Sequence, residues 1–269
     1  MLVRGRILTT TLEDPVSLLP ETKPPQRSGL DDDAANERFR LLYLRSFLLM
    51  RAIIGFIGLT LPVVLIVADH LLGPSAPTVR SSLSSYYYSG TRDYFVGSLF
   101  AAGVFLIAYK MFERSLSNLL SVVGGLAAIT VTLFPTQRPP GTAAALTPIQ
   151  QRLGEATVSH VHYTAASIFI VSLAIITFSF GRQEGRRSQQ RPSGRARLSP
   201  SFWRWFHWLA GLAILASVGF IIFAEREHFF TSYALLVGET VALVAFGASW
   251  LTKGLELDVL LGRSDSTPM

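Results

Sequence analysis

The chain has 269 residues, of which 49% are hydrophobic and 16% are charged, and its mean hydropathy is +0.39. Soluble domains carry about 25% charged residues, so this composition favours a membrane protein. The chain has no cysteine, which excludes disulfides, thiolate metal sites, iron–sulfur clusters and cysteine nucleophiles. The net charge of +6 is typical of basic cytoplasmic loops, and in the absence of a recognition motif we expect no nucleic-acid partner.

Residues 1–45 are polar, hold four prolines within the first 25 residues and include the acidic run Asp31-Asp32-Asp33. Because no apolar periodicity covers this stretch, we expect a largely disordered cytoplasmic tail. Within it, residues 36–45 could form a short amphipathic helix at the membrane surface. The first apolar run starts too late and is too long for the core of a signal peptide.

Six apolar runs follow the tail, and each is long enough with its flanks to cross the roughly 30 Å hydrocarbon core as a helix. They cover residues 46–67, 94–109, 116–134, 163–180, 202–224 and 229–251. Backbone groups in lipid find no water to bond, so runs of this length must be helices. The predicted fold is therefore all-α, a polytopic bundle of six transmembrane helices over residues 46–254.

The distribution of charge predicts the orientation of this bundle. Seventeen Lys and Arg residues fall in the tail, in loops 110–115 and 181–201 and after residue 251, whereas five fall in the alternate loops. Cytoplasmic loops hold the excess of Lys and Arg. Both termini, the flexible basic loop 181–201 and the C-terminal tail 255–269 are thus expected in the cytoplasm. The charged residues inside the runs are Arg51, Arg204 and Glu239.

Aromatic and small residues indicate where the helices meet the interface and one another. Tryptophans favour membrane–water interfaces, and those at the predicted inner ends of the last two helices are Trp203, Trp205, Trp208 and Trp250. Small residues let helices approach closely in lipid, and those expected at helix contacts are Gly97, Ala101, Gly103, Gly124, Gly125 and Ala127. Arg51 lies near the inner end of the first predicted helix, and its side chain is expected to extend to the inner membrane surface.

Ionisable residues gather at the predicted outer ends of the helices. Arg92 and Asp93 begin the second helix, where a carboxylate also favours the free N–H groups of the first turn without any catalytic role. His160 and His162 precede the fourth run, and His228 lies between the fifth and sixth. On a helix, a spacing of two residues turns His160 and His162 roughly 200° apart, so the pair could bind one metal ion only if the backbone were extended there. If the segment is helical, one of the two could face the bundle.

Glu239 lies about midway along the sixth run. A charge near the bilayer centre costs at least about 2.5 kcal/mol, so Glu239 should face the bundle interior, be neutral or have a partner. Eleven residues is close to three helical turns, which puts His228, Ser232 and Glu239 on one face and predicts a polar seam from the outer surface. The alternative is a buried glutamate that is hydrogen-bonded to a neighbouring helix.

Four passages resemble a group of uncharacterised bacterial six-helix integral membrane proteins. They are SYYYSGTRDYFVG from Ser85, GLAAITVTLFPT from Gly125, HYTAASIF from His162 and ETVALVAFGASWLTKG from Glu239. The resemblance covers roughly residues 46–254, implies a bacterial inner-membrane location and marks Arg92, Asp93, His162 and Glu239, but it implies no reaction.

A more distant similarity is to six-helix membrane proteins of the autophagy-modulator (DRAM) type. Another is to the hydrolases of the ceramidase and progestin-receptor (CREST) group, which implies a zinc site of Ser, Asp and three His in a seven-helix bundle. Here six helices are predicted and no H-x-x-x-H pair occurs, so this chain departs from the hydrolase pattern.

Four functions fit these patterns, and membrane lipids are the expected partners. The first is a protein that binds a lipid or small amphiphile in an outward-facing polar seam lined by Arg92, Asp93, His162, His228 and Glu239. The second is a zinc-dependent amide or ester hydrolase with His162, His228 and either Asp93 or His160 as ligands. The third is a proton-coupled carrier that uses Glu239. The fourth is a haem protein with His162 and His228 as axial ligands.

Overall fold

The computed structural model describes residues 29–72, 79–108, 116–140, 142–190 and 200–254, and within these ranges it contains helices and loops but no strand. The helices are α1 (Gly29–Leu72), the 3₁₀-helix η2 (Ser84–Tyr88), α2 (Arg92–Ala108), α3 (Leu116–Leu133), α4 (Pro148–Leu153), α5 (Glu155–Gln190), α6 (Pro200–Arg226) and α7 (Thr231–Gly254).

The chain divides into two units, Met1–Leu42 and Tyr43–Met269. In the first unit, residues 29–42 form the start of α1, and the side chains of residues 35–42 are exposed. This includes most of the short helix predicted over 36–45, whereas the predicted disordered tail before residue 29 lies outside the described residues. The helical bundle belongs to the second unit.

Five of the described helices are long and apolar enough to cross a membrane, namely α1, α3, α5, α6 and α7. The predicted second span corresponds to α2, which has 17 described residues and is followed by residues 109–115, outside the described part. The architecture is thus that of a helical membrane protein with several spans. A total of six spans and the cytoplasmic placement of both termini stay predictions.

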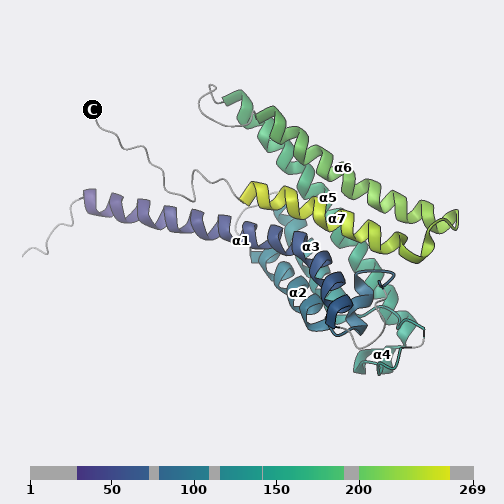
Figure 1. Cartoon of the computed structure of the whole chain (residues 1–269). Helices are drawn as coiled ribbons and strands as arrows, with labels where there is room; N and C mark the ends of the chain where they lie inside the picture. The colour runs from purple at the N-terminus through teal and green to yellow at the C-terminus, as the bar shows by residue number, and fades with distance from the viewer. Residues whose placement is uncertain (1–28, 73–78, 109–115, 141, 191–199, 255–269) are drawn as a thin grey trace, which may run out of the picture. The chain divides into compact units, whose positions relative to one another are not determined.

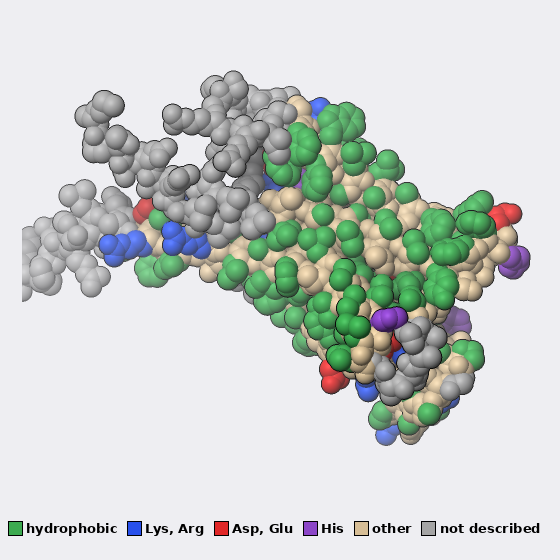
Figure 2. Space-filling view, in the orientation of Figure 1, with side chains coloured by type: hydrophobic (Ala, Val, Ile, Leu, Met, Phe, Trp, Pro, Cys, Tyr) green, Lys and Arg blue, Asp and Glu red, His purple; other side chains and the backbone are tan. Residues whose placement is uncertain are grey.

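Neighbouring helices of the bundle pack along their lengths. α5 contacts α3, α6 and α7, while α2 packs on α3 and α6 packs on α7, and Figure 1 shows α5, α6 and α7 running beside one another. Hydrophobic side chains cover the face drawn in Figure 2 over α6 and α7, and acidic and histidine side chains appear where α6 meets α7. This distribution fits helices that pass through lipid and turn in water.

Glycines bring two helix pairs into backbone contact. A Cβ atom on Gly103 of α2 would lie 2.8 Å from the carbonyl oxygen of Gly125 in α3. A Cβ atom on Gly58 of α1 would lie 3.0 Å from the Cα atom of Gly247 in α7. The predicted contact role of Gly103 and Gly125 is confirmed, but that of Gly97 is wrong, because Gly97 is exposed and a Cβ atom there would have no neighbour within 4 Å.

The bundle end opposite α4 holds buried polar side chains. Arg51 is 6% exposed, and its guanidinium lies 4.9 Å and 5.2 Å from the ring centres of Phe47 and Phe180. Arg51 therefore packs inside the bundle and does not extend to the surface as predicted. Lys253 of α7, also buried, pairs with Glu184 of α5.

One of the four predicted interfacial tryptophans also lies in the core. Trp250 is 0% exposed, and its ring centre lies 5.1 Å from that of Phe180 and 4.9 Å from that of Phe246. Trp205, by contrast, is 60% exposed, as expected of an interfacial residue. Trp250 follows Ser249 on the buried face of α7, where Ser249 bonds to His207 at 2.8 Å. Position near a helix end did not distinguish these two roles.

Candidate functional site

The end of the bundle that carries α4 is closed by a polar segment, residues 79–91, called here the docked loop. Its central part is η2. The buried residues of the docked loop include Ser82, Ser84, Ser85, Tyr86 and Tyr87. Non-helical backbone at membrane depth is tolerated only where protein or water-filled space surrounds it. The docked loop meets this condition because its polar groups bond to the helices around it.

Glu239 of α7 binds the start of η2. Its Oε2 accepts a hydrogen bond of 2.6 Å from the backbone N–H of Leu83, and its Oε1 accepts one of 3.3 Å from Ser84 Oγ. Leu83 is the N-cap residue of η2 and has no side-chain cap of its own. The N–H of Leu236 in α7 also donates to Ser81 O at 3.0 Å. Glu239 is thus hydrogen-bonded, as in the alternative prediction. Its partner, however, is the docked loop and not a neighbouring helix.

Two arginines hold the ends of the docked loop. Arg80 Nε lies 2.9 Å from Asp69 Oδ2 at the end of α1, and the Arg80 guanidinium lies 5.6 Å from the Tyr86 ring centre. Arg92 donates from Nη2 to the Tyr87 hydroxyl at 2.7 Å, and its guanidinium lies 4.3 Å from that ring. These contacts fix the loop against the start and end of the helices that it connects.

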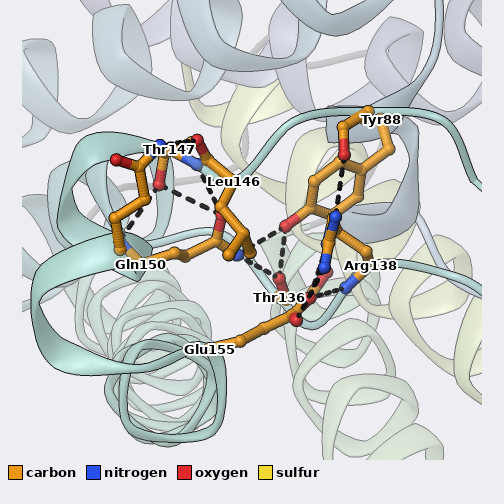
Figure 3. Close-up of polar contacts among 9 residues, drawn as sticks. Tyr88, Thr136, Arg138, Leu146, Thr147, Gln150 and Glu155 are labelled. Carbon is orange, nitrogen blue, oxygen red and sulfur yellow. Dashed lines mark hydrogen bonds and ion pairs between the residues drawn. The ribbon is translucent and has the colours of Figure 1, made fainter.

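Tyr88, the last residue of η2, joins the docked loop to the segment between α3 and α5. Its hydroxyl donates to Thr136 O at 2.5 Å and accepts from Gln150 Nε2 at 2.8 Å (Figure 3). Gln150 also donates to Thr136 O at 3.2 Å and forms a capping box with Thr147 at the start of α4. Burial raises the pKa of the Tyr88 hydroxyl above its ordinary value, although the bond from Gln150 acts in the opposite direction.

Arg138 and Glu155 secure the start of α5. The N–H of Arg138 donates to Glu155 Oε1 at 2.6 Å, its Nε lies 3.3 Å from the same oxygen, and its Nη1 donates to Ala144 O at 3.0 Å (Figure 3). Gly154, with φ of 84°, ends α4 and allows α5 to begin at once. α5 therefore starts at Glu155, well before residue 163 where the apolar run begins.

His160 and His162 lie on different faces of α5, as their spacing indicates. His162 is 1% exposed, and its Nδ1 lies 2.7 Å from Phe134 O. Because a carbonyl oxygen only accepts, Nδ1 carries the proton, and Nε2 is buried with no hydrogen-bond partner among the described residues. His160 is exposed and lines a groove between α3 and α5.

This groove has a volume of about 570 Å³. α3 and α5 are antiparallel along it, since Gly124 faces Ser172 whereas Phe134 faces His162. Thr157 and His160 therefore lie at the end nearest α4, and Ile168 lies deeper. The lining consists of Val123, Leu126, Ala127, Thr130, Thr157, His160, Val161, Thr164, Ala165 and Ile168.

The five residues of the predicted seam do not form one contact group. Arg92 bonds to Tyr87, Asp93 is exposed in the first turn of α2, and His162 is buried beside the end of α3. His228 precedes α7 in a turn with φ of 52° and is exposed, so it does not continue the helical face of Glu239. Among these five, the structure records no hydrogen bond or ion pair of one with another.

The predicted zinc ligands also lie apart. In the described ranges of the chain, no group of three or more His, Asp or Glu side chains could hold a metal ion. Asp93, His160, His162 and His228, all of them described, therefore form no ligand set in this structure. The geometry gives no support to a zinc site built from these residues.

Three features of this end were not predicted from the sequence. The docked loop has a polar composition that is also typical of an exposed loop. The start of α4 had a signal in the T-x-x-Q pattern of Thr147 and Gln150, which is that of a capping box. The groove also had a signal in the sequence, because the spacing of Thr157, His160 and Thr164 places these residues on one helix face.

Comparison of the chain with protein-family models, with curated proteins and with solved structures gives no match. The chain is therefore classed by its own geometry, as an all-helical protein with several helices that can cross a membrane. The resemblance to bacterial six-helix membrane proteins stays a prediction, and the function has to be argued from the sites described above.

Proposed function

We propose that the protein is a six-helix membrane protein of the plasma membrane, with both termini in the cytoplasm, that binds one membrane lipid in the groove between α3 and α5. The groove replaces the seam predicted around Glu239 as the binding site. The observation that carries the proposal is the change in polarity along the groove. Thr157 and His160 lie at its α4 end, Thr130 and Thr164 lie halfway, and Val123 and Ile168 lie at its deep end.

A lipid has the same order of polarity as this lining. Its headgroup would meet the imidazole of His160 and the hydroxyl of Thr157 near the membrane surface. Its acyl chain would lie against the aliphatic side chains farther along α3 and α5. The volume of about 570 Å³ is within the range of roughly 300–1,000 Å³ that is usual for small-molecule sites. The groove lies between two candidate spans, so lipid is the amphiphile that surrounds it.

The test uses a phospholipid that carries a photoactivatable group on its acyl chain, with the protein reconstituted in nanodiscs. We expect crosslinks to concentrate on residues 123–130 and 157–168. Thr164→Trp should lower them severalfold because the larger side chain fills the groove from its rim. Ser167→Trp is the matched control, since Ser167 is also an exposed hydroxyl residue of α5 but does not line the groove.

Two results would contradict the proposal. One is crosslinking that is as strong on the exposed apolar residues of α6, such as Leu209 and Leu212, as on the groove. The other is a loss of groove labelling that is the same for both tryptophan variants. Either would show that the lipid meets the whole apolar surface and has no preferred site between α3 and α5.

A further inference from the structure

We propose that Glu239 is a proton-binding site that controls whether the loop 79–91 stays docked in the α4 end of the bundle. The proposal rests on one juxtaposition: the carboxylate of Glu239, inside the span of α7, meets a non-helical polar segment that belongs to the connection between α1 and α2. It is independent of lipid binding between α3 and α5.

The hydrogen bonds are strongest with the ionised form of Glu239. One carboxylate oxygen accepts from the N–H of Leu83 at 2.6 Å, and the other accepts from Ser84 Oγ at 3.3 Å. An ionised carboxylate accepts at both oxygens, whereas a protonated carboxyl group must donate at one of them. A proton on the oxygen that faces Leu83 would oppose another donor. A proton on the other oxygen would turn the Ser84 hydroxyl into an acceptor and leave two neutral bonds, which are weaker than bonds to a carboxylate.

The surroundings of Glu239 explain why a proton is a plausible competitor for the loop. Both partners of its carboxylate are neutral, and a charge inside a membrane span is costly unless it is compensated.

Other ionisable groups also lie near the docked loop or Glu239, and they take part in ion pairs, hydrogen bonds or electrostatic interactions there. Their elements are α1, the loop itself, α2, α5 and α6. At the loop, Arg80 pairs with Asp69, and Arg92 bonds to Tyr87. Tyr163 of α5 lies within electrostatic range of both Glu239 and Glu225 of α6. The set is Asp69, Arg80, Tyr86, Tyr87, Tyr88, Arg92, Tyr163 and Glu225.

The docked loop is also held at its two ends, away from the residues that Glu239 binds. Tyr88 and Arg92 hold its C-terminal end, and Arg80 holds its N-terminal end. Among the described residues, the hydrogen bonds from α7 to residues 81–84 come from Glu239 and from the N–H of Leu236. Protonation of Glu239 therefore weakens the part that lies deepest along α7. Release of that part would expose the hydroxyl groups of Ser82, Ser84 and Ser85 and open the α4 end to water.

Hydroxyl-radical footprinting tests this, because Tyr86 and Tyr87 are only 1% and 6% exposed when the loop is docked. The full-length protein in nanodiscs would be oxidised at a series of pH values, with the exposed Tyr43 as internal reference. We expect low oxidation of Tyr86 and Tyr87 at neutral pH and a severalfold rise on acidification. Glu239→Gln should show the high level at every pH, since its neutral amide cannot ionise and replaces both bonds to a carboxylate by weaker neutral ones.

Glu225→Gln is the matched control, because Glu225 is an exposed glutamate near the same end and its loss should leave the pH response unchanged. Protected tyrosines in Glu239→Gln, or a response to acid that persists in it, would overturn the proposal. Should Glu239→Gln fail to fold, as judged by circular dichroism, Glu239→Asp decides. Its shorter carboxylate should shift the midpoint of the response, and an unchanged midpoint would assign the response to another group.

Discussion

The hydroxyl group of Tyr88 joins three segments that are far apart in the sequence. It bonds to Thr136 after α3 and to Gln150 in α4, while its own residue ends η2. A buried hydrogen bond contributes little in net terms, but a buried partner that is left without one costs much more. Single atoms at this end of the bundle are thus expected to influence stability strongly.

Tyr88→Phe should lower the free energy of unfolding by about 1–3 kcal/mol, because Thr136 O loses a donor and Gln150 Nε2 loses an acceptor. Tyr94→Phe is the control: Tyr94 is 37% exposed and its hydroxyl has only a 3.4 Å contact with Thr60. Its removal should change stability by less than about 0.5 kcal/mol. Denaturant unfolding of both variants in detergent micelles provides the measurement, and equal losses would contradict the network.

The raised pKa of Tyr88 adds a dependence on pH. Burial makes the folded protein hold this proton more tightly than the unfolded chain, where the reference pKa is 10.0. The stabilisation is therefore fully present below about pH 10 and is lost as the pH rises through the folded value. The difference in stability between wild type and Tyr88→Phe should shrink above pH 10, while Tyr86, whose pKa burial also raises, is common to both and cancels.

Individual residues also show where sequence reasoning stops. Glu239 was identified as unusual because a charge inside an apolar run requires a partner, and the structure gives it one. The identity of that partner was not predictable, since Leu83 contributes a backbone N–H that has no signature in the sequence. His228 was misplaced on the face of Glu239 because the extrapolation assumed a helix through residue 230, where the chain instead takes positive φ values at His228 and Phe230.

At the scale of helices, small residues predicted contacts only in part. Gly103 and Gly125 were correctly identified, whereas Gly97 on the same helix as Gly103 faces outward. Composition alone cannot separate them, because both lie in the same apolar run and the face that meets α3 depends on the partner. The start of α5 was also missed, because its first turns are polar. Hydropathy detects only the part of a helix that is apolar enough for lipid, here from residue 163, whereas the helix itself begins at Glu155.

Helix packing supplies its own prediction. Gly103→Ala and Gly125→Ala should each destabilise the protein by about 1–3 kcal/mol, since the added Cβ would lie 2.8 Å or 2.5 Å from a backbone oxygen of the facing helix. Gly97→Ala should be neutral or slightly stabilising, because the added methyl group meets open space and alanine favours a helix. Thermal unfolding in detergent ranks the three, and a loss in Gly97→Ala that matches the others would contradict the packing of α2 on α3.

At the scale of the whole molecule, hydropathy predicted the class of fold because the cost of an unbonded amide in lipid acts on every residue of a span. The structure adds what hydropathy cannot detect, namely a polar loop that lies among the helices. Five of the described helices are long and apolar enough to cross a membrane, and the predicted sixth span corresponds to α2. The predicted sidedness rests on the Lys and Arg counts, and an accessibility experiment tests it.

The absence of cysteine makes that experiment direct, since one introduced cysteine becomes the only thiol in the chain. A membrane-impermeant maleimide applied to intact cells should label Leu153→Cys in α4 and Glu227→Cys between α6 and α7, both of which replace exposed residues. Ser188→Cys in the last turns of α5 and Ser264→Cys near the C-terminus should react only after the cells are opened. Labelling of all four positions after lysis shows that each thiol can react. If α2 did not cross the membrane and the N-terminus stayed in the cytoplasm, α4 and the α6–α7 turn would be cytoplasmic, and Ser188 and Ser264 would lie outside. Labelling of Ser188→Cys from outside would therefore reject the N-in, C-in arrangement.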